Sequence, residues 1–452
     1  MRPETTHTIL NPCLKHLILL ILQTFLSTSE AKIQALPLKS QVIPSGYLPR
    51  PPNKLRFHHN VSLTVSITAG TPPQNVTMVI DTGSELSWLH CTNNTTNTTR
   101  VIPDPFFNPN HSSSYSPISC SSSTCTTRTR DFPIPASCDS NNLCHATLSY
   151  ADASSSEGNL ASETFGFGSS VDPGIVFGCM NSSYTTTNSD SDSNTTGLMG
   201  LNLGSLSFVS QLKLPKFSYC ISGYDFSGVL LLGETNFSWV GSLNYTPLVQ
   251  LSTPLPYFDR SAYTVRFKGI KVSDRLLNIS GTDLTPDHTG AGQTMFDLGT
   301  QFTFLLGPVY SVLRDEFLRQ TNGTLRVLDD PNFVFQTAMD LCYRVPENQT
   351  RIPELPSVSL VFDGAEMRVS GAQLLYRVPG LVRGNDSVYC FTFGNSDLLG
   401  VEAFIIGHHQ QQNMWMEFDL VKHRMGLAHA RCDLVGQKLL GVGSVGPLGS
   451  LG

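Results

Sequence analysis

The chain has little charge for its length and few segments with helical periodicity. Only 14% of its 452 residues are Asp, Glu, Lys or Arg, and the formal net charge is −6. A chain with so few basic residues offers no extended positive surface for nucleic acid, so we expect no nucleic-acid partner. Most apolar runs are short and end at Gly, Pro, Asn or Ser. This pattern favours an all-β fold over a helical one.

Several motifs of catalysis and metal binding are absent. The sequence contains no G-x-S-x-G, no H-E-x-x-H, no glycine-rich phosphate loop and no C-x-x-C pair. These absences argue against serine hydrolase, zinc protease, nucleotide-binding and thioredoxin-like chemistry. The stretch "HHQQQN", which begins at His408, has no accompanying carboxylate or cysteine cluster. We interpret it as a polar strand end rather than a metal site, and we expect no metal and no cofactor.

The N-terminal apolar run, "LKHLILLILQTFL", is too short to span a membrane easily. It is followed by "SEA", which ends at Ala31 and resembles a signal cleavage site. We therefore interpret residues 1–31 as a signal peptide, with a membrane anchor as the alternative. On the first interpretation the mature protein has no membrane anchor.

Cysteines and sequons agree with secretion. One of the eleven cysteines, Cys13, lies in the signal segment, and the remaining even number suits disulfides in an oxidising compartment. N-x-[ST] sequons indicate glycosylated surface loops. They include Asn60, Asn97, Asn194, Asn236, Asn322 and Asn385. We predict entry into the secretory pathway, with the extracellular space (the apoplast in a plant), the endoplasmic reticulum and the vacuole left open as destinations.

Acidic residues are missing between Ala31 and Ile80, where five basic residues occur: Lys32, Lys39, Arg50, Lys54 and Arg56. We interpret residues 32–57 as a basic leader that is removed from a zymogen, with a solvated tail as the alternative. A leader of this charge would lie against an acidic cleft near neutral pH and bind less tightly as carboxylates become protonated.

The two halves of the chain carry a similar pattern. "TMVIDTGSELSW" surrounds Asp81 and "TMFDLGTQFTF" surrounds Asp297, and each reads as an apolar strand, Asp, one residue, Gly and a hydroxyl residue. Each is followed later by two apolar residues and Gly, in "TGLMGLN" and "AFIIGHH". The repeat implies a duplicated unit. We predict a first lobe at 58–250, a second lobe at 251–435 and a flexible tail at 436–452.

Two facing aspartate loops can perform acid–base chemistry. Carboxylates a few ångströms apart cannot both ionise, so the pair holds one proton at moderately acidic pH. The ionised member can take a proton from a water that attacks a peptide carbonyl, while the protonated member donates to the carbonyl oxygen. Supporting residues follow each aspartate. Gly83 and Gly299 allow close approach, and Ser84 and Thr300 can donate to the outer carboxylate oxygens.

At these residues the chain resembles the pepsin-type aspartic proteases, and more narrowly the plant nepenthesin-like branch. The stretches that carry the resemblance are "GTPPQNVTMVIDTGSELSW", "LCHATLSYADASSSEGNLASETF", "LPKFSYCISG", "FTFLLGPVY" and "VYCFTFGNSD". It implies a bilobal, pepsin-like all-β fold with two six-stranded-type β-barrel lobes and a few short helices. It also implies a monomeric endopeptidase that cleaves polypeptides at acidic pH.

The resemblance assigns roles residue by residue. Asp81 and Asp297 would be the catalytic pair, and Tyr150 would lie on a hairpin flap that closes over the substrate. Trp88 would donate its indole N–H to the Tyr150 hydroxyl, besides being a core residue. Residues 91–144 would be a cysteine-rich insertion in the first lobe. The implied disulfides are Cys91–Cys179, Cys120–Cys144, Cys125–Cys138, Cys220–Cys432 and Cys342–Cys390.

The second loop departs from the family pattern, because Leu298 stands where the family has Ser or Thr. In the family each loop's hydroxyl bonds the backbone of the other loop. Thr82 can still reach the backbone at Leu298 and Phe296, whereas Leu298 cannot bond Thr82 N–H or Ile80 C=O. Each buried group left unpaired costs about 1–3 kcal/mol, so Leu298 could slow turnover.

Three functions are therefore open. Retention of both aspartates and both outer hydroxyls favours an aspartic endopeptidase. The loss at Leu298 favours a catalytically impaired homologue that acts as a binding or inhibitor protein. A glycosidase could use the same two carboxylates, but the surrounding motifs are those of proteases.

Overall fold

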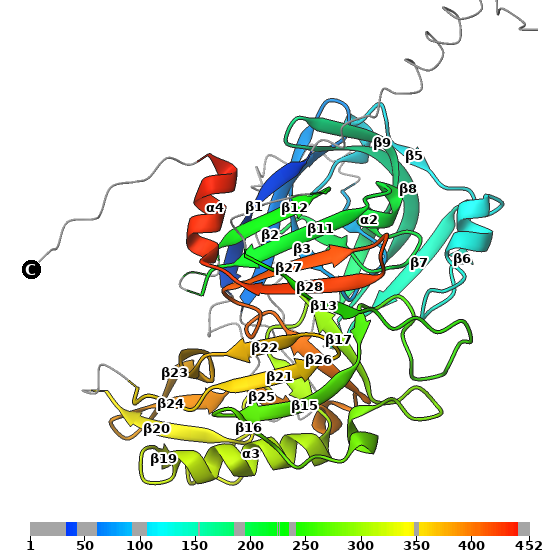
Figure 1. Ribbon diagram of the computed structural model, residues 1–452. Coiled ribbons are helices and arrows are strands. Elements are labelled where there is room, and N and C mark those ends of the chain that lie inside the picture. The colour runs from blue at the N-terminus through cyan, green and yellow to red at the C-terminus, as the bar shows by residue number, and fades with distance from the viewer. Residues whose placement is uncertain are drawn as a thin grey trace, which may run out of the picture.

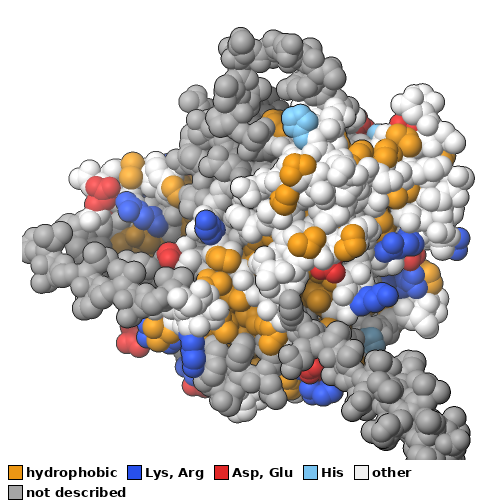
Figure 2. Space-filling view, turned by 90° about the horizontal axis from the view of Figure 1, so that it is seen from above, with side chains coloured by type: hydrophobic (Ala, Val, Ile, Leu, Met, Phe, Trp, Pro, Cys, Tyr) orange, Lys and Arg blue, Asp and Glu red, His pale blue; other side chains and the backbone are white. Residues whose placement is uncertain are grey.

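The computed structural model describes residues 33–42, 61–92, 106–151, 154–184, 195–223, 225, 227–234, 241–347 and 352–441. The predicted signal peptide and four of the named sequons (Asn60, Asn97, Asn194 and Asn236) lie outside these residues. The chain forms two β-rich lobes, one above the other in Figure 1, with few helices. The face drawn in Figure 2 intersperses basic, acidic and apolar side chains.

Within the described residues, besides a 3-10 helix (Pro109–His111) and a π-helix (Thr124–Arg128), the first half of the chain supplies twelve strands and one short α-helix. They are β1 (Gln34–Val42), β2 (Val61–Ala69), β3 (Gln74–Asp81), β4 (Trp88–His90), β5 (Ser116–Pro117), β6 (Ser137–Cys138), β7 (Cys144–Ser149), β8 (Ser155–Phe167), β9 (Ser170–Tyr184), β10 (Gly197–Gly200), α2 (Phe208–Gln211), β11 (Lys216–Ile221) and β12 (Gly228–Leu232). Alternation explains β3, because Val76, Met78 and Ile80 face the core while the residues between them are more exposed.

The second half supplies the remaining elements. They are β13 (Asn244–Pro247), β14 (Thr264–Val265), β15 (Phe267–Val272), β16 (Arg275–Leu276), β17 (Gln293–Asp297), β18 (Thr303–Leu305), α3 (Gly307–Thr321), β19 (Arg326–Val327), β20 (Cys342–Pro346), β21 (Val358–Phe362), β22 (Glu366–Val369), β23 (Leu375–Arg383), β24 (Asp386–Phe391), β25 (Phe393–Asn395), β26 (Ala403–Gly407), β27 (Met414–Asp419), β28 (Arg424–His429) and α4 (Cys432–Leu440). Helix α3 begins with Pro308 in its first turn and buries Val309, Leu313 and Phe317 on one face.

The largest sheet takes strands from both halves of the chain. Its order is β13-β28-β27-β11-β12-β1-β2-β3-β10-β4-β9-β8-β7-β6, with β5 paired to β8. Strands β27 and β28 therefore extend the sheet of the first lobe, although they come from the end of the second half (Figure 1). The second lobe adds a five-stranded sheet, β14-β17-β26-β18-β25, and two four-stranded sheets. The expected all-β bilobal fold is confirmed.

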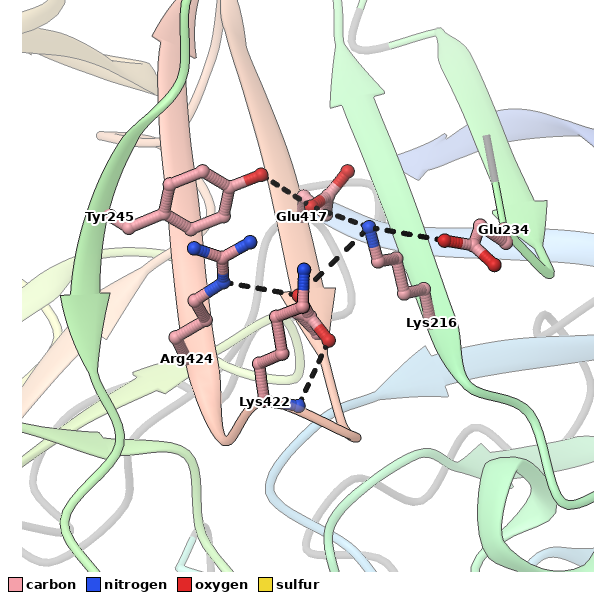
Figure 3. Close-up of polar contacts among 7 residues, drawn as sticks. Lys216, Glu234, Tyr245, Glu417, Lys422 and Arg424 are labelled. Carbon is pink, nitrogen blue, oxygen red and sulfur yellow. Dashed lines mark hydrogen bonds and ion pairs between the residues drawn. The ribbon is translucent and has the colours of Figure 1, made fainter. Parts of the chain in front are cut away.

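A buried ionic cluster lies where the halves share this sheet (Figure 3). Lys216 Nζ on β11 lies 3.4 Å from Glu417 Oε1 and 3.9 Å from Asp419 Oδ2 on β27. Tyr245 OH on β13 donates to Glu417 Oε1 at 2.8 Å. Arg424 Nε on β28 donates to Asp419 Oδ2 at 3.1 Å. Because the side chains of Glu417 and Asp419 are only 4% and 1% exposed, their charges need these partners.

Strand β1 lies inside the predicted leader, residues 32–57. Its first residues, 34–38, pair antiparallel with β12, and its last residues, 39–42, pair antiparallel with β2. Leu36 and Leu38 are buried in the main core of the molecule. The rest of the predicted leader, residues 43–57, lies outside the described residues. Cleavage of the leader stays a prediction, but its first part is a strand that pairs first with β12 and then with β2.

Helix α4 corrects the predicted boundary of the flexible tail. The helix runs to Leu440, so residues 436–440 are ordered as its last turns. Cys432 at its start is bonded to Cys220, and Val435 is buried in the same hydrophobic cluster. These two anchors explain why the helix continues beyond the second lobe's last strand.

The sequence repeat appears as two matched pairs of parallel strands. Strand β10 runs beside β3 with Gly200 opposite Asp81, and β26 runs beside β17 with Gly407 opposite Asp297. Each aspartate is thus the last residue of a strand whose neighbour ends in glycine. A side chain at Gly200 would meet backbone atoms of Glu85, and one at Gly407 would meet backbone atoms of Phe302, in each case just beyond the aspartate of the same lobe, so only glycine fits there.

Candidate active site

Asp81 and Asp297 are held by equivalent hydrogen bonds. The Gly83 N–H donates to Asp81 Oδ1 at 2.7 Å, and the Gly299 N–H donates to Asp297 Oδ1 at 2.9 Å. The outer oxygens accept from hydroxyls: Ser84 Oγ donates to Asp81 Oδ2, and Thr300 Oγ1 donates to Asp297 Oδ2, the latter at 2.5 Å. Each carboxylate is therefore oriented by its own loop at both oxygens.

The two loops meet at their glycines. A Cβ placed on Gly83 would lie 3.1 Å from Asp297 Oδ1, and one placed on Gly299 would collide with Asp81 Oδ1. Each glycine thus lies against the aspartate of the other lobe, and the two carboxyl side chains are close enough for a hydrogen bond between them. Larger residues at either position would push the lobes apart.

Burial and proximity change the acidity of this pair. Burial, and next the charge of Asp297, raise the pKa of Asp81 to about 8. The causes are physical: a buried carboxylate loses hydration, and two neighbouring negative charges repel. The arrangement therefore favours one shared proton, as expected for a general acid and a general base that act together.

Only one half of the reciprocal contact between the loops is present. Thr82 Oγ1 accepts the Leu298 N–H at 2.9 Å and donates to the Phe296 carbonyl at 3.3 Å. Leu298 is 1% exposed and belongs to the main core, and its side chain has no polar atom to return the contact. The two hydrogen bonds predicted for the Thr82 hydroxyl are present. At the equivalent position of the second loop, the Leu298 side chain makes apolar contacts in place of hydrogen bonds.

The predicted flap residues are brought together. Strands β7 and β8 form a hairpin, and Tyr150 lies just after β7. Trp88 Nε1 donates to the Tyr150 hydroxyl at 2.6 Å. Residues 152 and 153 at the tip lie outside the described residues. The bond ties the tip end of the hairpin to β4, the strand that follows the first aspartate loop.

Two of the five disulfides in the structure differ from those that the family resemblance implies, because Cys120 and Cys125 have exchanged partners. The five disulfides are Cys91–Cys179, Cys120–Cys138, Cys125–Cys144, Cys220–Cys432 and Cys342–Cys390. The implied pairs Cys120–Cys144 and Cys125–Cys138 are therefore wrong. Cys144 is fully buried and Cys125 packs against the same hydrophobic cluster, whereas Cys138 is exposed on β6. Cysteine spacing alone could not distinguish these connectivities.

The "HHQQQN" stretch follows β26 directly and is buried. His408 Nε2 lies 3.3 Å from the Val61 carbonyl and His409 Nε2 lies 2.9 Å from the Gln373 carbonyl. Burial lowers the pKa of His409 to about 4. In the part of the chain that the structure describes, no group of three His, Cys, Asp or Glu side chains could hold a metal ion. The His408 imidazole thus contacts a backbone carbonyl of β2 in the first lobe, and the His409 imidazole contacts one in the second lobe.

Sequence reasoning missed two buried tyrosines beneath the loops, Tyr219 and Tyr263. Their partners are residues far along the chain, so no local pattern signals them. Tyr219 OH donates to Gln411 Oε1, 192 residues away in sequence, and Tyr263 OH donates to the Leu201 carbonyl at 2.6 Å.

Two protein-family models match the chain. The model described as "Xylanase inhibitor N-terminal" matches residues 63–234, and the one described as "Xylanase inhibitor C-terminal" matches residues 262–429. Among curated proteins, Aspartic proteinase PCS1 of Arabidopsis thaliana is 64% identical over 90% of this chain and 90% of its own length. Aspartic proteinase nepenthesin-1 of Nepenthes gracilis is 31% identical, over 81% of this chain and 77% of its own.

Solved structures agree on the fold. The crystal structure of edgp matches with a TM-score of 0.63 and 19% identity, covering 89% of this chain and 96% of that one. The basic 7S globulin from soybean matches with a TM-score of 0.61 and 19% identity, covering 89% and 98%. At this identity the likeness concerns the fold alone.

Proposed function

This chain belongs to the plant pepsin-type aspartic proteases, and from that membership we propose that Asp81 and Asp297 are its catalytic pair. The relatives are named as proteinases, so the chain is an aspartic endopeptidase, and the alternative of an impaired binding homologue is not supported. The observation that carries the residue assignment is the matched set of hydrogen bonds around two carboxyls that face each other across the lobes.

The mechanism follows from where the proton resides. The raised pKa of Asp81 keeps one proton on the pair through acidic and neutral pH. A water held between the inner oxygens loses a proton to the pair as it attacks the substrate carbonyl. The carbonyl oxygen takes a proton from the pair, and the resulting tetrahedral diol then collapses as the pair protonates the leaving nitrogen. No covalent enzyme intermediate is needed.

Tyr150 and Trp88 serve the substrate side of this site. The hydrogen bond between them limits the positions that the flap hairpin can take above the aspartates. A flap held in this way can exclude water and cover an extended peptide, which would lower the entropy cost of positioning the scissile bond.

The cellular setting is proposed from the sequence. The segment 1–31, the five disulfides and the sequons support synthesis into the secretory pathway. Asn322 and Asn385, the two named sequons among the described residues, are exposed at the end of α3 and between β23 and β24. Among the described residues, no helix has the length and apolar character needed to cross a membrane.

The experiment is cleavage, at acidic pH, of a peptide with bulky apolar residues at the scissile bond. We expect hydrolysis that a pepstatin-type inhibitor abolishes, because the inhibitor's hydroxyl occupies the position of the attacking water. Hydrolysis that persists at saturating inhibitor would contradict the aspartic mechanism. Absence of hydrolysis in protein that binds the inhibitor and melts cooperatively would contradict a competent pair.

A further inference from the structure

Four buried aromatic rings form a cluster between the lobes. Phe217 and Tyr219 stand on β11, Tyr263 directly precedes β14, and Phe418 stands on β27. Phe418 stacks on Phe217 at 4.6 Å between centroids and lies 4.5 Å from Tyr263 and 5.7 Å from Tyr219. All four side chains are fully buried. The two tyrosine hydroxyls in this cluster point to opposite catalytic loops.

The Tyr263 hydroxyl reaches the first loop from the second half of the chain. It donates to the Leu201 carbonyl at 2.6 Å. The Leu201 N–H in turn donates to the carbonyl of Asp81 at 2.8 Å, and the preceding residue, Gly200, is the register partner of Asp81. A single residue therefore separates this hydroxyl from the backbone of the first aspartate.

The Tyr219 hydroxyl reaches the second loop from the first half of the chain. It donates to Gln411 Oε1, and Gln411 Nε2 donates to the Ile406 carbonyl at 2.7 Å. Ile406 is the register partner of Phe296, the residue before Asp297. Burial, together with the nearby charge of Asp297, holds the pKa of Tyr219 well above its ordinary value, so the hydroxyl remains a donor over the working pH range.

The two contacts cross the lobes in opposite directions, and each ends on the strand beside an aspartate. The loops themselves are linked by only one hydroxyl, that of Thr82, because Leu298 offers none. We propose that Tyr219 and Tyr263 are positioning residues that keep the two aspartates in register across the lobe boundary, in place of the hydrogen bonds that Leu298 cannot make. This proposal rests on the assignment of Asp81 and Asp297 as the catalytic pair.

A role in positioning differs from a role in stability alone. Loss of a buried hydroxyl should lower the melting temperature wherever it occurs. Loss of register should also lower turnover, because small displacements of catalytic groups reduce rates strongly. It should further shift the acidic limb of the pH–rate profile, since the distance between the carboxyls determines how far apart their two apparent pKa values lie.

The test compares three Tyr→Phe variants of the full protein. Tyr219→Phe and Tyr263→Phe each remove one cross-lobe hydroxyl. Tyr343→Phe is the matched control, because Tyr343 is fully buried and its hydroxyl lies 3.0 Å from Thr321 Oγ1 inside the second lobe. We measure kcat, KM, the pH profile and the melting temperature for each, with Asp81→Asn as the inactive reference.

We expect Tyr219→Phe and Tyr263→Phe to lower kcat by about 5- to 100-fold with KM changed by less than about threefold. Tyr343→Phe should lower the melting temperature by a similar amount and leave kcat within about twofold of the unmodified protein. In a Leu298→Ser background the effect of Tyr219→Phe on kcat should shrink, because the loop hydroxyl then shares the positioning role.

If both cross-lobe variants keep kcat while their melting temperatures fall as in Tyr343→Phe, the hydroxyls only stabilise the fold and the positioning proposal is wrong. Should Tyr219→Phe fail to accumulate, Tyr263→Phe carries the same test from the other lobe. An active Asp81→Asn protein would instead overturn the assignment of the catalytic pair, so the two failures are distinguishable.

Discussion

The first and second catalytic loops hold their aspartates alike but contribute differently to the contact between lobes. In both, a glycine N–H binds the inner oxygen and a hydroxyl binds the outer one. At the position after the aspartate, Thr82 makes two cross-lobe hydrogen bonds, whereas Leu298 makes apolar contacts. The difference shows that one set of residues orients each carboxylate and another holds the two lobes in position. The residues that orient the carboxylates are equivalent in the two loops, whereas those that join the lobes are not.

The largest expected effect tests the symmetric part of this comparison. Asp81→Asn and Asp297→Asn should each reduce acid-pH turnover by about 10³-fold or more, because a pair without its shared proton cannot act as both acid and base. Both variants should fold, because an amide has nearly the volume of a carboxyl. Its oxygen can accept the glycine N–H, and its NH2 can donate to the hydroxyl that donates to the carboxylate in the unmodified protein. Activity is measured on purified protein with circular dichroism as the control. A tenfold difference between the two residual rates would show that the loops are not equivalent in chemistry.

Asp81→Asn also tests the pH dependence of stability. The pKa of Asp81 is raised to about 8 in the folded protein, from an ordinary value of 3.8. The folded state therefore keeps a proton that the unfolded chain releases, and the associated stability is fully present below about pH 4 and lost as pH rises toward about 8. Melting temperatures measured from pH 4 to pH 8 should fall more steeply for the unmodified protein than for Asp81→Asn. Parallel curves would contradict a raised pKa.

The second effect concerns the sheet that joins the lobes away from the loops. Lys216→Met removes the cation nearest Glu417 and should destabilise the protein by about 3 kcal/mol at pH 7, because the buried carboxylate keeps the Tyr245 hydroxyl but loses its cationic partner. The control is Arg431→Met, which breaks an exposed ion pair with Asp433 and should change the free energy of unfolding little. Chemical denaturation gives both values. Equal costs would mean that the cluster in Figure 3 does not join the lobes.

Thr82→Val should cost about 1–3 kcal/mol, because it leaves the buried Leu298 N–H without an acceptor. It should also lower kcat, since the last hydroxyl between the loops is gone. Thr246→Val is the matched control: Thr246 is fully buried, and its hydroxyl has no hydrogen-bond partner among the described residues. If the two variants unfold at the same denaturant concentration, the hydrogen bonds that Thr82 makes with the second loop contribute nothing to stability.

The smallest effect is the gain from Leu298→Ser. A restored hydroxyl should bond the first loop and add about 1 kcal/mol, with faster turnover at acidic pH. Leu298 is, however, packed in the main core, and a smaller residue leaves a cavity whose cost has the opposite sign. Measurements of the melting temperature and of kcat together show whether the net effect of Leu298→Ser is a gain or a loss. A variant that melts lower and cuts no faster would show that the interface is adapted to leucine.

Much of the site could be predicted because its signals are local. The repeated strand-Asp-x-Gly pattern predicted both loops, and the hydroxyl residues three positions after each aspartate predicted the hydrogen bonds to its outer oxygen. The glycines two positions after each aspartate were predicted only to allow close approach, and their N–H bonds to the inner oxygens were not predicted. The contact of Thr82 with Leu298 and Phe296 followed from the family geometry. These inferences need only the order of residues within each loop and the assumption that the two similar halves of the chain face each other.

The features that sequence reasoning missed depend on distant partners. Tyr219 and Gln411 meet only because β11 and β27 share a sheet, which no local periodicity reveals. The partners of Cys120 and Cys125 are separated from them by 18 and 19 residues, and such similar spacings do not decide which of the two pairs with Cys138. The helical turns beyond residue 435 depend on contacts of α4 with the first lobe's sheet.

The shared sheet also determines the order in which the protein can fold. Strand β11 pairs with β27, and the Cys220–Cys432 disulfide closes a loop of 212 residues. On a ribosome that adds ~5–20 residues per second, the second partner of β11 follows about 190 residues later, after roughly 10–40 s. During that interval β11 is an open edge strand, the kind of surface that pairs wrongly with other chains. The first lobe is therefore not an independent folding unit, and a chain that stops before Met414 should aggregate rather than yield a soluble half-protease.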